Sequence, residues 1–160
     1  MPQAPAPTRR ALLASSAQLA AVLASAGLVP ARARAQAPGY LAAAFDARTI
    51  ADATRALAAA APVESREVSL SAPDIAEDGA LVPIGAATTL PGVRRLLILV
   101  EKNPAVLAAL FELSDAVEPN LATRIKMAQT SNVYAVAMLA DGRNLFARRE
   151  VRVTLGGCGG

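Results

Sequence analysis

The sequence has no histidine and no tryptophan, and it has one cysteine and three phenylalanines among 160 residues. Without an imidazole the chain cannot form a histidine-based triad, metal site or acid–base catalyst, and one thiol cannot complete a zinc or iron–sulfur centre. Phe45, Phe111 and Phe146 are too scattered for a platform that stacks bases, and we expect them in the core. No glycine-rich phosphate loop precedes a helical pattern. These absences exclude histidine-based catalysis, histidine or thiolate metal sites and a glycine-rich phosphate-binding loop.

Acidic residues are absent from the first 35 positions, which contain Arg9, Arg10, Arg32 and Arg34. These four arginines account for the alkaline isoelectric point, because the remaining 125 residues carry 12 basic and 13 acidic side chains, a net charge of −1. The positive charge thus belongs to this leading segment, and it does not indicate a nucleic-acid partner.

The leading segment has the three parts of an export signal. The pair Arg9-Arg10 precedes an Ala/Leu/Val-rich run over residues 11–29, and small residues then alternate with arginines. This order is typical of a signal peptide, and the double arginine resembles a twin-arginine signal, whose route carries folded proteins. We expect residues 1–35 to be cleaved after Ala35, leaving a periplasmic protein with no membrane attachment. The alternative is an uncleaved anchor, since the run is about long enough to span a bilayer, but Gln18 and several serines weaken that interpretation.

The pattern after the leader predicts one helix followed by short strands. Alanine and leucine dominate residues 40–61 with apolar residues near one face, and Pro62 ends the predicted helix. Strand patterns cover residues 68–71, 80–84, 93–101, 123–128, 133–139 and 145–155, while 106–113 fits strand or helix. Turn signals at Asp78-Gly79, Pro91-Gly92 and Asp141-Gly142 separate them. Residues 36–155 are therefore predicted to form a mainly β domain, a β-sandwich with an N-terminal helix.

Two groups of charged residues need no functional explanation. Asp74, Glu77 and Asp78 form a small acidic cluster, which we interpret as a solvated turn because a calcium site needs more ligands. Arg148 and Arg149 beside Glu150 indicate a solvated strand face or part of a partner contact.

The last five residues are the exception. They place the sole cysteine, Cys158, between two glycine pairs, Gly156-Gly157 and Gly159-Gly160. Glycine has no Cβ and gains little by folding onto a domain, so we expect a flexible and thin arm, residues 156–160. Cys158 is the third residue after Leu155, which limits its reach to ~10 Å at ~3.3–3.6 Å per residue. A free thiol, with a pKa of ~8.5, can act as a nucleophile or sulfur acceptor once a partner deprotonates it.

This chemistry leaves several classes open. The first is a covalent carrier that other enzymes act upon. The second is a ubiquitin-like carrier with a thiocarboxylate at Gly160, although its activation needs ATP, which an exported protein lacks. The third is an exported assembly protein that cross-links through Cys158. An accidental cysteine at a frayed terminus is a further alternative, but an exposed thiol risks oxidation, and a chain that keeps this liability is expected to use it.

Several motifs resemble the SoxY family, the carrier subunit of the periplasmic Sox thiosulfate-oxidation system. The most specific is the strand 151–155 followed by the Gly-Gly-Cys-Gly-Gly tail, and segments 72–80, 100–104 and 123–128 also match. The departures are mild: Asp74 and Asp78 stand where the family has Glu and Asn, and Ala105-Val106 replaces a more proline-rich continuation.

The resemblance implies an immunoglobulin-like β-sandwich that pairs stably with SoxZ. It also implies that SoxAX oxidatively joins thiosulfate to Cys158 as a cysteine S-thiosulfonate, that SoxB hydrolyses off sulfate, and that the sulfur dehydrogenase SoxCD can oxidise the remaining sulfane sulfur. The chain itself would then have no catalytic residue. We further expect a transient docking surface near the tail, separate from the larger SoxZ interface.

Overall fold

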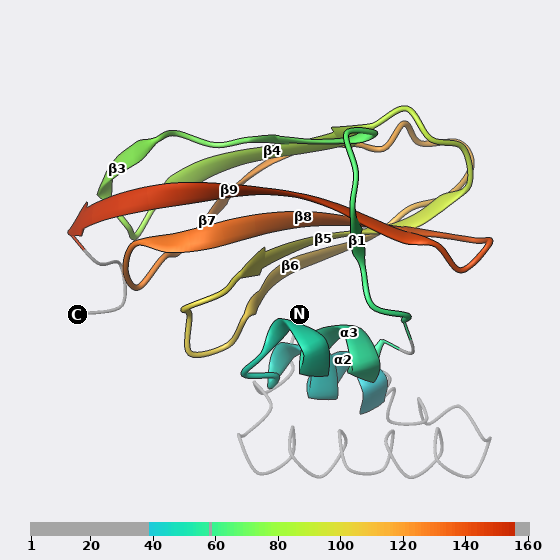
Figure 1. Cartoon of the computed structure of the whole chain (residues 1–160), viewed down its shortest axis with the longest axis horizontal. Coiled ribbons are helices and arrows are strands. Elements are labelled where there is room, and N and C mark those ends of the chain that lie inside the picture. The colour runs from blue at the N-terminus through green and yellow to red at the C-terminus, as the bar shows by residue number, and fades with distance from the viewer. Residues whose placement is uncertain (1–38, 58, 156–160) are drawn as a thin grey trace, which may run out of the picture. The chain divides into compact units, whose positions relative to one another are not determined.

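The computed structural model describes residues 39–57 and 59–155 (Figure 1). The predicted signal with Arg9 and Arg10 lies outside the described residues, as do Cys158 and the glycines of the arm. Within the described residues two helices precede nine strands, and none of the helices is long and apolar enough to cross a membrane. The elements are α2 (Gly39–Phe45), α3 (Ile50–Ala56), β1 (Val63–Glu64), β2 (Val68–Ser71), β3 (Ile75–Asp78), β4 (Val82–Thr88), β5 (Val93–Val100), β6 (Leu107–Glu112), β7 (Asn120–Ile125), β8 (Ser131–Leu139) and β9 (Asn144–Leu155).

The single helix predicted over residues 40–61 is in fact two short helices. Thr49 has an extended backbone and caps α3, where its Oγ1 accepts a 3.1 Å hydrogen bond from the Asp52 amide. Because this cap satisfies a free amide of the first turn, it starts a new helix and interrupts the alanine-rich run. The break allows both helices to pack small side chains against the sheet, and Ala44 and Ala53 are fully buried there. Phe45, expected in the core, is instead 42% exposed at the end of α2.

The strands form an immunoglobulin-like β-sandwich. One sheet has the order β1-β9-β8-β5-β6, with β3 also paired to β9, and the second has the order β2-β4-β7 (Figure 1). The region 106–113, which fitted strand or helix, contains strand β6. Positive φ angles at Gly92 and Gly142, 73° and 88°, place glycine where the chain turns before β5 and between β8 and β9, as the turn signals predicted.

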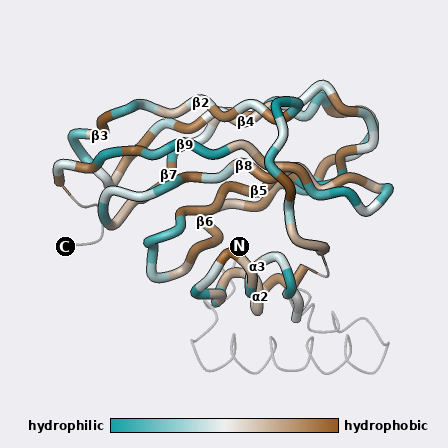
Figure 2. Tube along the Cα trace, viewed as in Figure 1, coloured by the Kyte–Doolittle hydropathy of each residue, from teal (hydrophilic) through white to brown (hydrophobic). Residues whose placement is uncertain are grey.

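Strand β5 contains a continuous run of apolar residues because both of its faces are buried. Its alternate residues Leu96, Ile98 and Val100 belong to the core between the sheets, whereas Leu97 and Leu99 belong to a second core. That second core also contains buried residues of α2 and α3 and lies on the opposite face of the sheet. Since successive side chains point to opposite faces, a strand covered on both sides needs apolar residues throughout. Figure 2 shows this hydrophobic colouring along β5.

Candidate functional site at the end of strand β9

The candidate site is the end of β9, from which the cysteine-bearing arm departs. Leu155 is the last described residue, and Cys158 follows three residues later. Covalent geometry alone places the Cα of Cys158 within ~10 Å of the Cα of Leu155. Whatever holds the end of β9 therefore determines where the thiol can be presented.

Strand β9 has hydrogen-bonded neighbours on both edges. Strand β8 pairs with it antiparallel as far as Ser131 opposite Val151. On the other edge β1 pairs with Leu145 and Phe146 near the start of β9, and β3 pairs with its last residues, both in parallel. The β3 register places Ala76 beside Val153 and Asp78 beside Leu155. Strand β3 therefore continues the support of β9 after the ladder with β8 has ended.

Each of the last three residues of β9 has a hydrogen-bond partner beyond its own strand. The Val153 amide donates to Thr130 Oγ1 at 3.0 Å, and Thr154 Oγ1 donates to the Glu77 carbonyl at 2.8 Å. The Gly79 amide donates to the Leu155 carbonyl at 2.7 Å. A hydrogen bond of this kind contributes about 0.5–1.5 kcal/mol net. The strand is thus held up to its last described peptide group.

The turn at Asp78-Gly79 connects the end of β9 to the second sheet. The Gly79 carbonyl accepts a 2.7 Å hydrogen bond from the amide of Met127, whose side chain is fully buried just after β7. Asp78 Oδ1 accepts from the Ala80 amide at 2.7 Å and so stabilises the turn. The amide–carbonyl series from Met127 through Gly79 to Leu155 therefore crosses between the layers. The sequence predicted this turn but not its contact with β9.

An ion pair fixes the start of β3 against β9. Arg149 Nη2 lies 2.6 Å from Asp74 Oδ1, and the Asp74 carbonyl accepts from the Arg152 amide at 3.0 Å. The hydrogen bond from Arg149 lowers the pKa of the Asp74 carboxyl, and the charge of the same guanidinium adds to the effect. Both side chains are solvent-exposed, so screening limits the contribution of this pair to stability.

The other charged residues singled out in the sequence lie on the surface. Among the described residues, no three potential ligands are grouped so that they could hold a metal ion. Glu77 and Asp78 are exposed to solvent as expected, but they lie on strand β3 and not in a turn, because this segment pairs with β9. Arg148 lies 3.6 Å from Glu64 and forms an ion pair between β9 and β1. A role for this face in partner contact stays a prediction.

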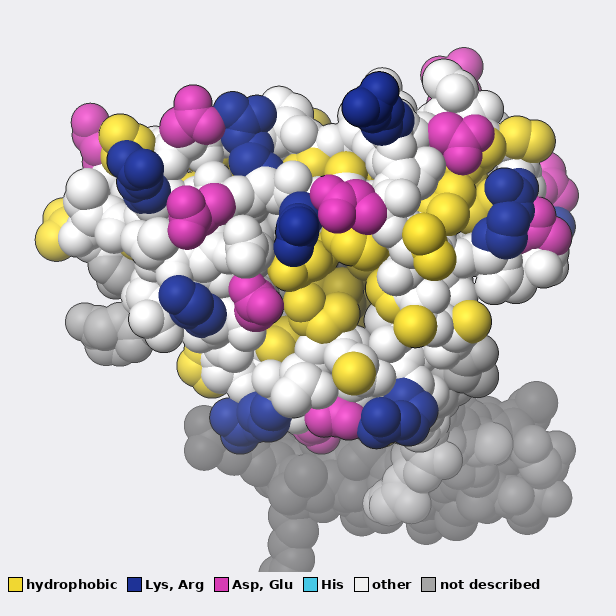
Figure 3. All heavy atoms as spheres, in the orientation of Figure 1, with side chains coloured by type: hydrophobic (Ala, Val, Ile, Leu, Met, Phe, Trp, Pro, Cys, Tyr) yellow, Lys and Arg dark blue, Asp and Glu magenta, His cyan; other side chains and the backbone are white. Residues whose placement is uncertain are grey.

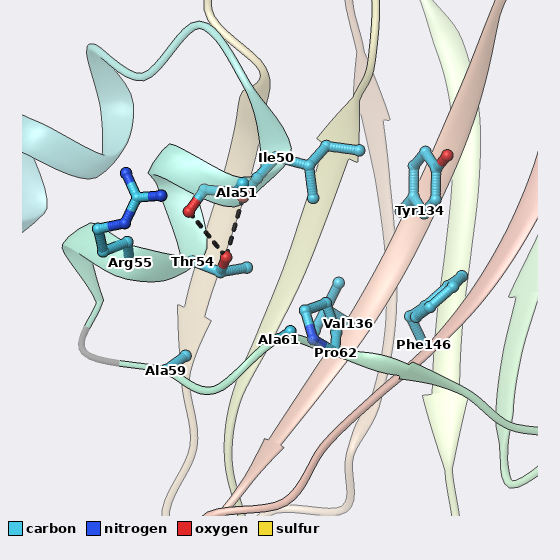
Figure 4. A pocket seen from close by; sticks show the side chains of 10 residues that line it. All are labelled: Ile50, Ala51, Thr54, Arg55, Ala59, Ala61, Pro62, Tyr134, Val136 and Phe146. Atoms are coloured by element: carbon cyan, nitrogen blue, oxygen red, sulfur yellow. Dashed lines mark hydrogen bonds between the residues drawn. The ribbon is translucent and has the colours of Figure 1, made fainter.

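A separate apolar hollow lies on the outer face of the larger sheet (Figure 3). It has a volume of about 520 Å³ and is bounded by α3, the segment before β1 and the rings of Tyr134 and Phe146, which are 5.5 Å apart. Figure 4 shows that Thr54 turns its hydroxyl to the carbonyls of Ile50 and Ala51. The one charged side chain in the lining, Arg55, pairs with Asp52 at 2.6 Å. Thr54 and Arg55 are thus already engaged within α3, and the described residues of this lining show no arrangement of paired catalytic groups.

Sequence reasoning missed most of the contacts that hold the end of β9. Thr130 and Gly79 are brought to β9 by tertiary pairing, and nothing in their local sequence indicates this role. Phe146 packs against the core beneath the helices, as expected, and Phe111 is half-buried on edge strand β6. The signal that did identify the site was the cysteine itself, just beyond the final strand.

Comparisons with known proteins agree on one family. The family described as "Sulfur oxidation protein SoxY" matches residues 53–158. The solved structure of the sulfur carrier protein SoxY from Chlorobium limicola f thiosulfatophilum is 34% identical, with a TM-score of 0.60 over 67% of this chain and 97% of that chain. A variant of the superoxide reductase (neelaredoxin) from Ignicoccus hospitalis is 13% identical, with a TM-score of 0.49 over 54% of this chain and 78% of that one. No curated protein matches the chain. The family match extends over more than half of the sequence, and on that basis the chain belongs to the SoxY family of sulfur-oxidation proteins.

Proposed function

We propose that this sulfur-oxidation carrier protein holds its substrate covalently on Cys158. The observation that carries the proposal is the position of the chain's sole thiol, three residues beyond a strand end that is held on both edges. The family match extends to residue 158 and so includes this cysteine. Apart from Cys158 the arm has only glycines, so no other side chain competes for the substrate or widens the segment.

The loading step joins two sulfur atoms. The Cys158 thiolate and the outer sulfur of thiosulfate form an S–S bond and lose two electrons, which pass to a haem enzyme of the Sox system. The product is a cysteine S-thiosulfonate. Water then attacks the terminal sulfonate sulfur and breaks its bond to the sulfane sulfur, which releases sulfate and two protons and leaves a persulfide on Cys158. A dehydrogenase can oxidise this sulfur before a second hydrolysis.

In these steps the chain positions the substrate on Cys158 for partner enzymes, and the enzymes carry out the catalysis. The groups that bond directly to the last three described residues of β9 include backbone amides and carbonyls and two threonine hydroxyls, and they hold the strand. We propose that SoxAX loads the carrier, that SoxB hydrolyses the adduct, that SoxCD oxidises the sulfane sulfur and that SoxZ forms the stable heterodimer. Covalent attachment keeps the intermediates from diffusing away and raises their local concentration at each docked enzyme.

We also propose that this chemistry takes place in the periplasm. Support comes from the leader sequence, with Arg9-Arg10 before an alanine-rich run and small residues before Ala35. Expression of the full chain, fractionation and sequencing of the mature N-terminus test the proposal. Recovery from the cytoplasm with the leader intact, in cells with a working twin-arginine system, would contradict it.

Intact-mass spectrometry tests the covalent role directly. The mature protein is incubated with thiosulfate and the loading enzyme, with Cys158→Ser as the control. We expect an added thiosulfonate mass on the wild-type chain and none on the variant, which keeps its fold and its heterodimer. Disulfide dimers without any adduct would favour a cross-linked assembly protein instead. A mass change at the Gly160 carboxylate would favour the thiocarboxylate carrier.

A further inference from the structure

We propose that the stable partner subunit adds a β-strand to the larger sheet at the free edge of strand β6. This β6 edge consists of residues Ala108 to Phe111. Its occupant is one extended, uncharged strand of the permanent partner, which pairs with the backbone of β6. The inference rests on the proposed function, in which SoxZ forms the stable heterodimer, and adds to it the surface of this chain that the partner occupies.

Strand β6 is the last strand of the larger sheet, in the order β1-β9-β8-β5-β6 (Figure 1). Among the described residues, β5 is the one strand that pairs with it. The Leu113 amide donates to the Arg94 carbonyl at 2.8 Å, and the antiparallel register is regular back to Ala109 opposite Ile98. Because successive residues direct their backbone groups to alternate sides, the amide and carbonyl of Leu110 point away from β5. They are therefore available to an added strand.

The β6 edge lacks the residues that usually protect an edge strand from pairing. Such strands usually are very short, or they carry charged side chains or proline. The five residues from Leu107 to Phe111 include no charged residue and no proline. Helix cover is present at the start of the strand, where the Val106 amide donates to the Ala47 carbonyl at 3.1 Å, but the four residues of the β6 edge are half-buried. An apolar and accessible edge of this kind is expected to bind another strand.

The other free edges of the described sandwich do have such protection. In the smaller sheet, β2 is four residues long, and β7 contains Arg124 and is followed by Lys126. In the larger sheet, β1 has two residues, and β3 has four, which include Glu77 and Asp78. This contrast distinguishes β6 as the edge that a partner strand covers.

The β6 edge lies far enough from the arm to leave Cys158 accessible. The register across β5 and β8 places the start of β6, Leu107, level with Arg148 of β9. Three steps between strands span ~14 Å, and the seven residues from Arg148 to Leu155 span ~23 Å. Because the arm reaches only ~10 Å from Leu155, a subunit bound at β6 need not cover the thiol. A permanent partner must leave the thiol accessible, whereas an enzyme that acts on Cys158 must approach it.

The cores on both faces of the sheet indicate what the partner strand contains. Phe111 lies opposite Leu96, which belongs to the core between the sheets. Leu110 lies opposite Leu97, which belongs to the core beneath the helices. Since paired residues share a face of the sheet, an added strand with apolar residues at alternate positions extends these apolar layers. In this mode of binding, main-chain hydrogen bonds provide affinity and the alternate side chains provide specificity.

Hydrogen exchange of the wild-type chain, alone and in complex with purified SoxZ, tests the inference directly. We expect the Leu110 amide to exchange about tenfold more slowly in the complex, because it gains a hydrogen bond to the partner strand. The Ala122 amide on edge strand β7 is the matched control. It also points away from its neighbouring strand, since the Thr88 amide donates to the Pro119 carbonyl at 2.9 Å and the register continues to Ala122 opposite Gly85. Its exchange is expected to change less than about twofold.

Substitutions test whether the β6 edge provides the affinity of the complex. Phe111→Lys places a charge in the apolar layer, and Leu110→Pro removes the amide that points toward the partner. Each is expected to raise the Kd for SoxZ about tenfold, measured by titration calorimetry. Ala122→Lys adds the same charge to exposed Ala122 on β7 and is expected to leave the Kd within about twofold. Thermal melting of each free variant verifies that it is folded.

Three results would overturn the assignment of the β6 edge. They are equal exchange of the Leu110 amide with and without SoxZ, an unchanged Kd in folded Phe111→Lys, and equal weakening in Ala122→Lys. A mature chain that forms dimers by itself and already protects the Leu110 amide would assign the edge to a second copy and would also overturn it. If the wild-type chain forms no complex with SoxZ, the heterodimer of the proposed function fails, and this inference fails with it. A complex with an unprotected Leu110 amide refutes this inference alone, so the two failures are distinguishable.

Discussion

Replacing Thr130 by valine tests whether the end of β9 is held as the structure indicates. The substitution keeps the β-branched shape but removes Oγ1, which accepts the 3.0 Å hydrogen bond from the Val153 amide. Strand β8 begins at Ser131, so the ladder between β8 and β9 offers no replacement acceptor at this position. The Val153 amide would then have to bond to water.

The expected loss of stability in Thr130→Val follows from the partial burial of this hydrogen bond. A net hydrogen bond contributes about 0.5–1.5 kcal/mol, and a buried donor left without a partner costs about 1–3 kcal/mol. Thr130 and Val153 are half-buried, so water can replace the lost acceptor, and we expect a loss near 1 kcal/mol. That free energy corresponds to about fivefold more frequent opening of the strand end.

Hydrogen exchange of the purified protein measures this opening residue by residue. We expect the Val153 amide to exchange about fivefold faster in Thr130→Val, while the central amides of β5 change less. Thr123→Val is the matched control, since Thr123 is a half-buried strand residue for which the structure shows no side-chain hydrogen bond. Unchanged exchange at Val153, or the same acceleration in the control, would refute this account of how the arm is anchored.

Three further predictions concern the arm, the β3 ion pair and the core. Gly157→Val and Gly159→Val are expected to slow single-turnover loading and hydrolysis without lowering the melting temperature, because a branched side chain thickens the arm; unaltered rates would count against a narrow channel. Asp74→Asn is expected to lower stability in urea at neutral pH. The lowered pKa of Asp74 means that its contribution is present above its ordinary value of 3.8 and is lost as the pH falls below it, so the two proteins should converge in acid, and a constant difference down to pH 2 would contradict this. Leu97→Ala should destabilise by about 2–5 kcal/mol in urea, since Leu97 is fully buried beneath the helices, and a loss below about 1 kcal/mol would refute its place in that core.

Local pattern was sufficient for the strands that run through the core. Residues 93–101 were predicted as a strand from five consecutive apolar residues and the following Asn-Pro, and β5 occupies Val93–Val100. The run 145–155 likewise corresponds to β9, Asn144–Leu155. In β5 the apolar residues are continuous, and in β9 apolar and polar residues alternate, so each burial pattern can be predicted from the local sequence. The strand predicted over residues 123–128 overlaps β7 but lies too far along the chain, because β7 ends at Ile125. Met127 is buried after the end of that strand.

Local pattern failed where a cap or a distant partner decides the structure. The alanine-rich stretch 40–61 is compatible with one helix throughout, and the competing Thr49–Asp52 cap is visible only when its backbone conformation is known. The parallel pairing of β3 with β9 joins segments far apart in sequence, and no periodicity within either segment specifies that register. The cysteine and its glycines could therefore be recognised from the sequence, whereas the supports beneath them could not.

Those supports determine how far the thiol can move from a fixed point. With Leu155 bound to Gly79, Cys158 is the third residue after the held strand end, a reach of ~10 Å. If Thr154 and Leu155 detached, Cys158 would be the fifth residue after the held Val153, and the reach would grow to ~17 Å. The accessible volume would then increase about fivefold, and the local concentration of the bound sulfur at a docked enzyme would fall by the same factor. If Cys158 carries the substrate as proposed, the hydrogen bonds from Gly79 and Thr154 favour function by limiting the length of chain between the held strand and the thiol.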